Sequence, residues 1–195
     1  MDRPAPWPLL LLVGGPPGCG KTTLARRLGR ALGLPVLSKD DFKESLYQTL
    51  GAPDRDASAA LGRAAIHLLS SIGARLLDSG PGVILESNFY PGLAEPELAP
   101  LRARARGAQL LCGGDPETIV RRYTARAARG ERHPGHYDFE QVPRLRQQLA
   151  ERFFQPLDLD LPALRVDTTS AEPYRPDFDA LLAFVMDAAA PPPGR

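Results

Sequence analysis

The chain of 195 residues is poor in cysteine and lysine and has no large excess of charge of either sign. Its two cysteines, Cys19 and Cys112, are too few for a disulfide framework, and their wide separation in the sequence is typical of a reducing compartment. We therefore expect a cytoplasmic protein. Lysine and arginine together number 24 against 23 acidic residues, so the net charge of +1 does not indicate a basic nucleic-acid-binding domain.

Long hydrophobic runs are also missing. The longest early apolar run, 9–13, is shorter than the roughly 7 to 15 residues of a signal-peptide core. No stretch approaches the roughly 18 apolar residues of a membrane span. Neither export nor a membrane partner is therefore expected. Hydrophobic residues make up 43% of the chain, which excludes wholesale disorder. This length predicts one domain over 1–195, with a core at about 9–189 and a frayed tail at 190–195.

Short apolar runs alternate with amphipathic segments along the chain. Strands are expected at 9–13, 35–37, 83–85, 108–112 and 164–166. Helices are expected at 24–32, 41–50, 57–79, 98–106, 115–129, 139–154 and 178–189. The helix that begins at Asp115 should be capped by this side chain, with Pro116 at the first helical position. The alternation predicts an α/β fold, a five-stranded parallel sheet with helices on both faces.

Residues 15–22 read GPPGCGKT and match the phosphate-binding pattern G-x-x-x-x-G-K-[ST], with a strand before and a helix after. Glycines let successive backbone N–H groups point at phosphate oxygens, and the helix N-terminus adds a favourable dipole. Lys21 can reach the outer phosphates, and Thr22 can hold Mg²⁺. We therefore predict binding of ATP with Mg²⁺. The candidate nucleotide-binding residues in this loop are Gly15, Pro16, Pro17, Gly18, Cys19, Gly20, Lys21, Thr22 and Thr23.

A pair of carboxylates follows the second expected strand, in the segment 38–43 (SKDDFK). Ligands of open α/β sheets bind at this carboxyl edge. One interpretation is helix capping, by Ser38 with Asp41 or by Asp41 with Glu44. Capping explains Asp41 but leaves Asp40 without a structural role. Asp40 is therefore the candidate general base for an acceptor hydroxyl.

The third expected strand ends in Glu86 and is followed by Asn88. Glu86 could act near Mg²⁺ or could equally cap or pair locally. Asn88, with Phe89 and Tyr90, could contact an acceptor, although two partly buried aromatic residues are an equally good interpretation.

Five arginines lie between 121 and 132. Helical spacing places Arg122, Arg126 and Arg129 on one face. A solvated face is possible, but like charges one turn apart repel slightly, which favours a nearby polyanion. His133 and His136 could suggest a metal, yet no further ligand lies close in the sequence, so we expect a lid at about 129–140 with a hinged turn.

The motifs GPPGCGKTT, SKDDFK, VILESN and TIVRRYTAR resemble small P-loop kinases and AAA family ATPases related to polynucleotide 5′-kinase domains, zeta toxins and chloramphenicol phosphotransferase. The resemblance covers about 9–185 and is most specific in the P-loop. It implies that Asp40 is the catalytic base, the first residue of a D-D-x-R motif in which Lys43 replaces the arginine. It also implies that Arg122 and Arg126 are the paired lid arginines. Glu86 stands where an aspartate is more usual.

We therefore expect an ATP-dependent kinase that phosphorylates a hydroxyl of a small metabolite, sugar or antibiotic, or a nucleic-acid 5′-hydroxyl. Nucleic acid is less favoured, because lysine lacks the bidentate fork of arginine. The alternative is an ATP-hydrolysing switch that acts on a protein partner; no N-K-x-D guanine signature is present. The expected catalytic residues are Lys21, Asp40, Arg122 and Arg126, with Arg126 also on the nucleotide; the acceptor residues are Asp40, Lys43 and Asn88; and the metal residues are Thr22 and Glu86.

Overall fold

The computed structural model of the chain describes residues 7–129, 142–143, 145–147, 149, 155–170 and 174–190. The predicted lid beyond Arg129, including His133 and His136, lies outside the described residues, as do most of the predicted helix 139–154 and the tail from 191.

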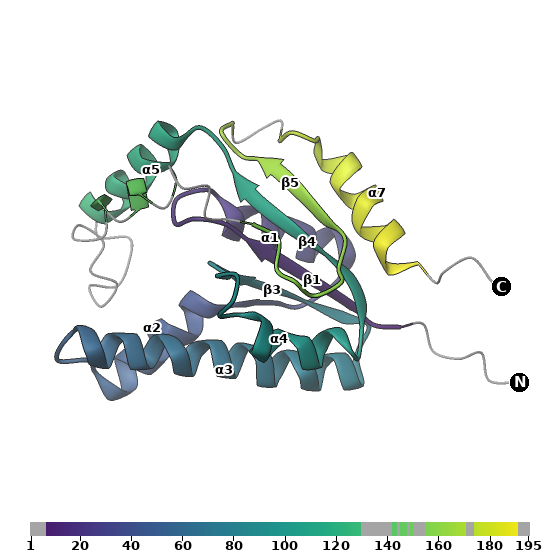
Figure 1. Cartoon of the computed structure of the whole chain (residues 1–195), viewed down its shortest axis with the longest axis horizontal. Helices are drawn as coiled ribbons and strands as arrows, with labels where there is room; N and C mark the ends of the chain where they lie inside the picture. Colours follow the sequence, from purple (N-terminus) through teal and green to yellow (C-terminus); the bar gives the residue numbers. More distant parts are fainter. Residues whose placement is uncertain are drawn as a thin grey trace, which may run out of the picture.

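The described residues form one parallel sheet of five strands, as predicted, and the strand order is β2-β3-β1-β4-β5 (Figure 1). The strands are β1 (Leu9–Gly14), β2 (Val36–Ser38), β3 (Gly82–Ser87), β4 (Arg106–Gly113) and β5 (Ala163–Asp167). The central strand β1 is buried along its whole length, as expected for a strand that is covered on both faces.

Helices cover both faces of this sheet. They are α1 (Lys21–Leu32), α2 (Lys39–Leu50), α3 (Arg55–Ser79), α4 (Glu95–Arg102), α5 (Pro116–Ala128) and α7 (Phe178–Ala189). Because side chains alternate along a strand, Leu11 and Val13 of β1 pack toward α1 and α7, whereas Leu10 and Leu12 pack toward α3 and α4. These two hydrophobic clusters hold the sheet between its two helical layers.

Several predicted helix boundaries were wrong. Helix α1 begins at Lys21 rather than at Leu24, and α4 begins at Glu95 rather than at Leu98. The predicted helix 98–106 ends at Arg102, and Arg106 already belongs to β4. The apolar spacing of Leu101 and Ala105 continues past the end of the helix because both residues are buried in the same core, so periodicity does not mark the boundary. Helix α2 begins at Lys39 rather than Asp41.

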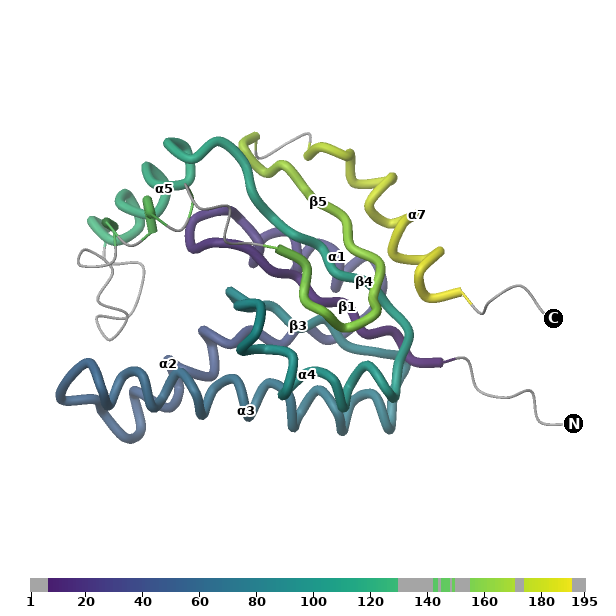
Figure 2. Tube along the Cα trace, in the orientation of Figure 1, coloured from purple at the N-terminus to yellow at the C-terminus, as the bar shows by residue number. Residues whose placement is uncertain are grey.

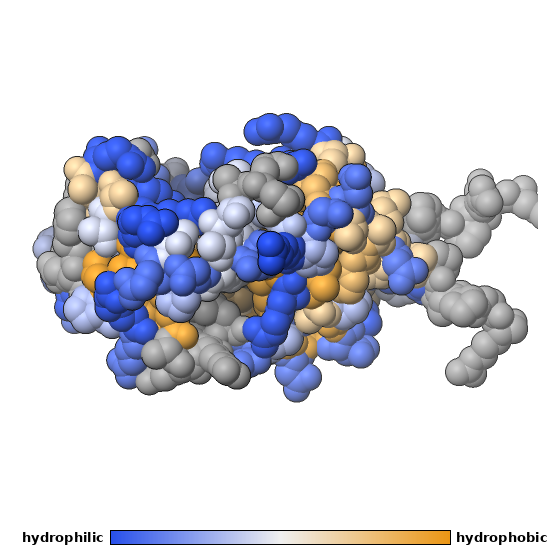
Figure 3. Space-filling model, turned by 90° about the horizontal axis from the view of Figure 1, so that it is seen from above, coloured by the Kyte–Doolittle hydropathy of each residue, from blue (hydrophilic) through white to orange (hydrophobic). Residues whose placement is uncertain are grey.

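The carboxyl ends of the strands meet at one edge of the sheet (Figure 2). The P-loop, residues 15–22, follows β1; α2 follows β2, and α5 follows β4. The described chain ends lie at the opposite edge, where Arg106 donates to the carbonyl oxygen of Ala190 at 2.7 Å and stacks over Trp7. Seen from above, a larger hydrophobic area lies toward the end that carries α7, whereas hydrophilic and hydrophobic residues are mixed at the end that carries α5 (Figure 3).

Candidate active site

The P-loop is wedged between the end of β4 and α5. At Gly15, with φ 147°, a Cβ atom would lie 2.4 Å from the carbonyl oxygen of Cys112. At Gly18, with φ 87°, it would lie 2.7 Å from the carbonyl oxygen of Ile119. Glycine is therefore required here both for its left-handed backbone and for the close approach of neighbouring chain.

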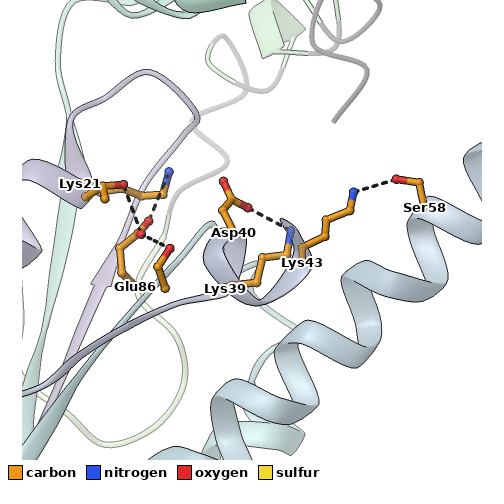
Figure 4. A network of polar contacts seen from close by, with 8 residues as sticks. Lys21, Lys39, Asp40, Lys43, Ser58 and Glu86 are labelled. Atoms are coloured by element: carbon orange, nitrogen blue, oxygen red, sulfur yellow. Dashed lines mark hydrogen bonds and ion pairs between the residues drawn. The ribbon is translucent and has the colours of Figure 1, made fainter. Parts of the chain in front are cut away.

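A buried carboxylate joins three segments at the mouth of this loop (Figure 4). Glu86, 3% exposed, lies 3.6 Å from the Nζ of Lys21 through its Oε1. Its Oε2 accepts hydrogen bonds from the hydroxyls of Ser38 at 2.7 Å and Thr22 at 3.2 Å. The P-loop, the end of β2 and the end of β3 are thus linked through one charged group.

The capping interpretation of Ser38 was wrong. Ser38 occupies the N-cap position of α2, but its side chain makes no capping hydrogen bond and is used by Glu86 instead. Asp41 lies inside the first turn, is exposed, and makes a long ion pair, 4.0 Å, with Arg26. A carboxylate in the first turn is still favourable, because it faces the positive end of the helix dipole.

Lys21, Thr22 and Ser38 together with Glu86 form what we call the Glu86 cluster. Asp40 lies between this cluster and Lys43 (Figure 4). Its Oδ1 accepts from the Nζ of Lys39 at 3.4 Å, and its side chain is 32% exposed. Lys43 donates to the buried hydroxyl of Ser58 at 2.8 Å, which ties α2 to α3. The chain has three lysines, Lys21, Lys39 and Lys43, and all of them lie in this region.

The arginine face of α5 and the P-loop line a common cavity of about 540 Å³. This volume lies within the usual range of ligand pockets, roughly 300 to 1,000 Å³. The structure thereby brings together Arg122, Arg126 and Arg129, which the sequence placed on one helical face. The lining residues are Gly18, Gly20, Thr23, Arg121, Arg122, Ala125, Arg126, Arg129, Thr168, Ser170 and Tyr174.

Arg122 and Arg126 differ in their contacts. Arg122 donates to the carbonyl oxygens of Thr168 at 2.8 Å and Thr169 at 2.7 Å, so it ties α5 to the segment after β5. The Nε of Arg126 is buried and has no hydrogen-bond partner among the described residues. A buried donor without a partner costs free energy, and an anion in the cavity would satisfy it.

The N-terminus of α5 is fixed to the same segment. As predicted, Asp115 caps the helix, with Pro116 at its start, and the hydrogen bonds from Thr118 lower the pKa of this carboxyl group. The backbone N–H of Asp115 also donates to the hydroxyl of Thr169 at 2.8 Å. The arginine face is therefore positioned from both the cap and the middle of the helix.

Other predicted residues lie around this site or away from it. Pro16 lines a second cavity of about 740 Å³ beside the ends of β4 and β5. The side chain of Cys19 is in the hydrophobic core, so only its backbone can face a nucleotide. Phe89 packs in the core, whereas the Oδ1 of Asn88 is buried without a hydrogen-bond partner in the described part of the chain.

Thr168, Ser170 and Tyr174 form a wall of this cavity that no sequence motif predicted. These residues follow β5 at the carboxyl edge of the sheet, where ligands of this fold class bind. Their position after the last strand, like that of the residues after β2 and β3, is the signal from which they could have been predicted.

The side chains present fit a magnesium nucleotide. Mg²⁺ is usually held by one or two carboxylates together with substrate phosphates, and Thr22 and Glu86 offer a hydroxyl and a carboxylate beside the P-loop. Within the described ranges, no group of three or more His, Cys, Asp or Glu side chains could hold a metal ion. Among the same residues, no helix is long and apolar enough to cross a membrane.

Comparison with solved structures supports this geometry. A protein from Chloroflexus aurantiacus j-10-fl whose name assigns it to the kinases is 37% identical, with a TM-score of 0.79 over 93% of this chain and 98% of that one. A sugar kinase from Janibacter sp. HTCC2649 shares the fold at 18% identity, with a TM-score of 0.60 over 94% of this chain and 96% of that one. A chain of the Pnkp1/Rnl/Hen1 RNA repair complex shares it at 22% identity, with a TM-score of 0.57 over 82% of this chain and 51% of that one.

No curated protein matches the chain. The family described as AAA domain matches residues 10–153, which is most of the chain. The resemblance to small P-loop kinases is confirmed by this match and by the Chloroflexus relative. The chain therefore belongs to the AAA domain family, among its P-loop kinase-like members.

Proposed function

We propose that the protein is an ATP-dependent kinase in which Asp40 activates a hydroxyl group of the acceptor. The observation that carries this proposal is the position of Asp40 on the first turn of α2, beside the Lys21 and Glu86 cluster (Figure 4). The bond from Ser38 to Glu86 fixes the start of α2 and so supports the placement of Asp40 two residues later.

The nucleotide would lie between the P-loop and α5. Backbone N–H groups of the loop and the ammonium of Lys21 would bind its phosphates, and Arg126 would meet their charge from the opposite wall. When bound at Thr22 and Glu86, Mg²⁺ would neutralise charge on the β- and γ-phosphates. Lys21 would turn from Glu86 toward the phosphates.

Asp40 would take the proton of the acceptor hydroxyl as its oxygen attacks the γ-phosphorus. The bond between that phosphorus and the β,γ-bridging oxygen breaks, and ADP leaves. Charge spreads over the transferred group during this step, and Lys21 and Arg126 would stabilise it. Lys39 would hold the Asp40 carboxylate in position through the hydrogen bond of 3.4 Å.

A small polyhydroxy acceptor is favoured over a nucleic acid. Lys43 replaces the arginine that would grip a phosphate bidentately, and its hydrogen bond to Ser58 directs it toward α3. The net charge of +1 also gives little long-range attraction for a polyanion. The similarity to a sugar kinase fits this preference.

A panel of acceptors with γ-labelled ATP tests the proposal. It should contain sugars, nucleosides, aminoglycosides, and 5′-hydroxyl DNA and RNA. We expect label to pass to a small polyhydroxy compound in the wild type and not in Asp40→Asn. Release of labelled phosphate that no acceptor stimulates and that Asp40→Asn does not change would contradict the kinase assignment and favour an ATP-hydrolysing switch.

A further inference from the structure

Arg122 and Arg126, which the resemblance to small P-loop kinases makes a catalytic pair, are engaged in different ways. The two terminal nitrogens of Arg122 donate to the carbonyl oxygens of Thr168, at 2.8 Å, and Thr169, at 2.7 Å. The buried Nε of Arg126 has no hydrogen-bond partner among the described residues. Arg126 therefore presents an unsatisfied donor to the cavity that both side chains line, whereas the terminal nitrogens of Arg122 are already used within the protein.

The segment that Arg122 binds is held at its other polar groups as well. The backbone N–H and the hydroxyl of Thr168 both donate to the carbonyl oxygen of Gly113, at 2.8 and 2.7 Å. The hydroxyl of Thr169 accepts the backbone N–H of Asp115 at 2.8 Å. Arg122 thus adds the hydrogen bonds to the carbonyl oxygens of a segment that is otherwise anchored to the end of β4 and the start of α5.

These bonds fix one wall of the nucleotide cavity. Thr168, Ser170 and Tyr174 form the wall after β5, and residues 168–170 belong to neither a helix nor a strand. Their backbone carbonyl groups therefore lack the regular partners that a helix or a sheet would supply. For two of these carbonyl groups, the guanidinium of Arg122 is the partner, and hydrogen bonds from a charged donor are stronger than those between neutral groups.

We propose that Arg122 is a positioning residue and not a catalytic one: it holds the wall after β5 through the carbonyl oxygens of Thr168 and Thr169, and so sets the affinity for the nucleoside part of the nucleotide. This inference rests on the proposed function, because it places ATP in this cavity. The phosphates belong at the end formed by the P-loop, so the nucleoside extends along the remaining lining, which includes this wall.

The loss of Arg122 should loosen the wall without removing a charge that acts on the phosphates. Two carbonyl oxygens would lose their charged donor, and the segment would become fully ordered only when the nucleotide binds. Ordering a segment at that moment takes up part of the binding free energy. Arg126 differs, because its charge meets the phosphates directly. The two arginines should therefore separate in experiments that vary the nucleoside and the phosphates independently.

Hydrogen exchange of peptides that cover residues 163–170 tests the positioning role without any nucleotide. We expect faster exchange at 168–170 in Arg122→Ala than in the wild type, and unchanged exchange in Arg126→Ala. Arg122→Lys keeps the charge but not the fork of two nitrogens, so its exchange should be intermediate. Circular dichroism verifies that the variants are folded, and Arg122→Lys decides the question if Arg122→Ala does not fold. Wild-type exchange in the folded Arg122 variants would overturn the proposal.

Calorimetry with two probes, ATP with Mg²⁺ and inorganic tripolyphosphate with Mg²⁺, separates the nucleoside from the phosphates. In Arg122→Ala we expect the dissociation constant to rise about tenfold for ATP and less than about twofold for tripolyphosphate. In Arg126→Ala both constants should rise by the same factor, because this side chain meets the phosphates. Equal rises for the two probes in Arg122→Ala would mean that Arg122 binds phosphate itself, and no rise for either would mean that its role is structural only; both results would contradict the proposal.

Turnover of ATP provides the matching kinetic comparison. Arg122→Ala should raise the KM for ATP and leave kcat within about threefold of the wild-type value, the reverse of the pattern expected for a catalytic arginine. A large fall in kcat at unchanged KM would show that Arg122 is catalytic after all. If the wild type bound neither probe, the proposed function would fail, whereas hydrogen exchange would still decide whether Arg122 holds the segment after β5.

Discussion

Lys21 and Glu86 form an ion pair that is almost completely buried. Such pairs contribute little to stability, because desolvation of both charges offsets their attraction. The hydroxyls of Ser38 and Thr22 donate hydrogen bonds to the other carboxylate oxygen of Glu86 and so lower the cost of burying this ion pair in the absence of a ligand. The position of this buried pair at the end of a phosphate-binding loop is therefore better explained by a role in ligand binding than by a role in stability.

Replacing Lys21 with methionine should remove the charge and keep most of the volume. Hydrogen bonds to charged groups contribute roughly 1.5 to 3 kcal/mol, so we expect the dissociation constant for ATP with Mg²⁺ to rise about 10- to 100-fold. Isothermal calorimetry measures this change, and circular dichroism verifies that the variant is folded. Wild-type affinity in the folded variant would contradict the assignment of the P-loop.

Asp167 should make the free energy of unfolding depend on pH in the acidic range. Hydrogen bonds from the side chain of Thr169 and from its backbone N–H, which lies 2.8 Å from the Oδ1 of Asp167, lower the pKa of this carboxyl group. A lowered pKa in the folded state contributes stability that is present above the unfolded pKa, about 3.9, and is lost as the pH falls through the folded pKa. Urea unfolding between pH 7 and pH 3 should show a weaker loss in Asp167→Asn. A constant difference between the two proteins at every pH would argue against this role.

The residues that the sequence identified are those with short-range signals. The P-loop could be recognised because its spacing reflects local backbone chemistry, and Asp115 because capping is local. Ser38 was misassigned because its partner, Glu86, is 48 positions away in the sequence, and no local pattern contains that information.

Helix α5 is the element that completes the nucleotide cavity, and its position depends on close packing against the P-loop. Gly18 and Gly20 both have positive φ angles, 87° and 89°, so alanine would be strained at either position. Only at Gly18 would the new Cβ overlap α5, 2.7 Å from the carbonyl oxygen of Ile119; at Gly20 the nearest atom is 4.0 Å away.

Gly18→Ala should therefore destabilise the protein more than Gly20→Ala. Overpacking typically costs about 1 to 3 kcal/mol, and this is the difference that we expect between the two free energies of unfolding. Denaturant unfolding of both variants measures it, with Gly20→Ala as the control for backbone strain. Equal losses would mean that α5 does not pack against the loop as described.

Arg126 should act on the reaction more than on nucleotide binding. If the Nε of Arg126, which has no hydrogen-bond partner among the described residues, meets charge that develops on the transferred group, Arg126→Ala should lower kcat about 10²- to 10³-fold and raise the KM for ATP less. Arg75 is an exposed arginine on α3, so Arg75→Ala is the matched control. Its free energy of unfolding should stay within about 0.5 kcal/mol of the wild-type value.

Steady-state kinetics at two salt concentrations, with each substrate varied in turn, separate the alternatives for Arg126. A salt-dependent rise in the KM of the acceptor alone would mean that the arginine face binds an anionic acceptor. Unchanged parameters in Arg126→Ala would show that the face is merely solvated.

Helix boundaries were predicted well where proline, glycine or a capping residue flanks the helix in the sequence. Helix α7 was predicted at its observed bounds, because Pro176 and Asp177 precede it and a proline-rich segment follows. Helix α4 was wrong because no glycine or proline separates its last turn from β4. Loop composition, more than hydrophobic periodicity, therefore decided which element ends could be predicted.

The two cores share the same sheet, and this unites the described chain. Alternate residues of β1 contribute to the two cores, so the helices on one face of the sheet cannot be separated from those on the other without dividing this strand between them. We propose that the chain is one domain on this basis. The alternation of strands and helices was enough to predict the parallel sheet, but the order of the strands and the wall after β5 depend on contacts between distant segments.

The pair of adjacent aspartates on α2 tests the proposed chemistry most directly. Asp40 lies beside the Glu86 cluster, whereas Asp41 is exposed and makes a long ion pair, so Asp41→Asn is a matched control of the same chemistry one residue away. With the acceptor found by the labelling panel, single-turnover transfer from ATP should fall about 10²- to 10⁴-fold in Asp40→Asn, at unchanged affinity for ATP, and should be nearly unaffected in Asp41→Asn. Loss of transfer in Asp41→Asn with full transfer in Asp40→Asn would contradict the account.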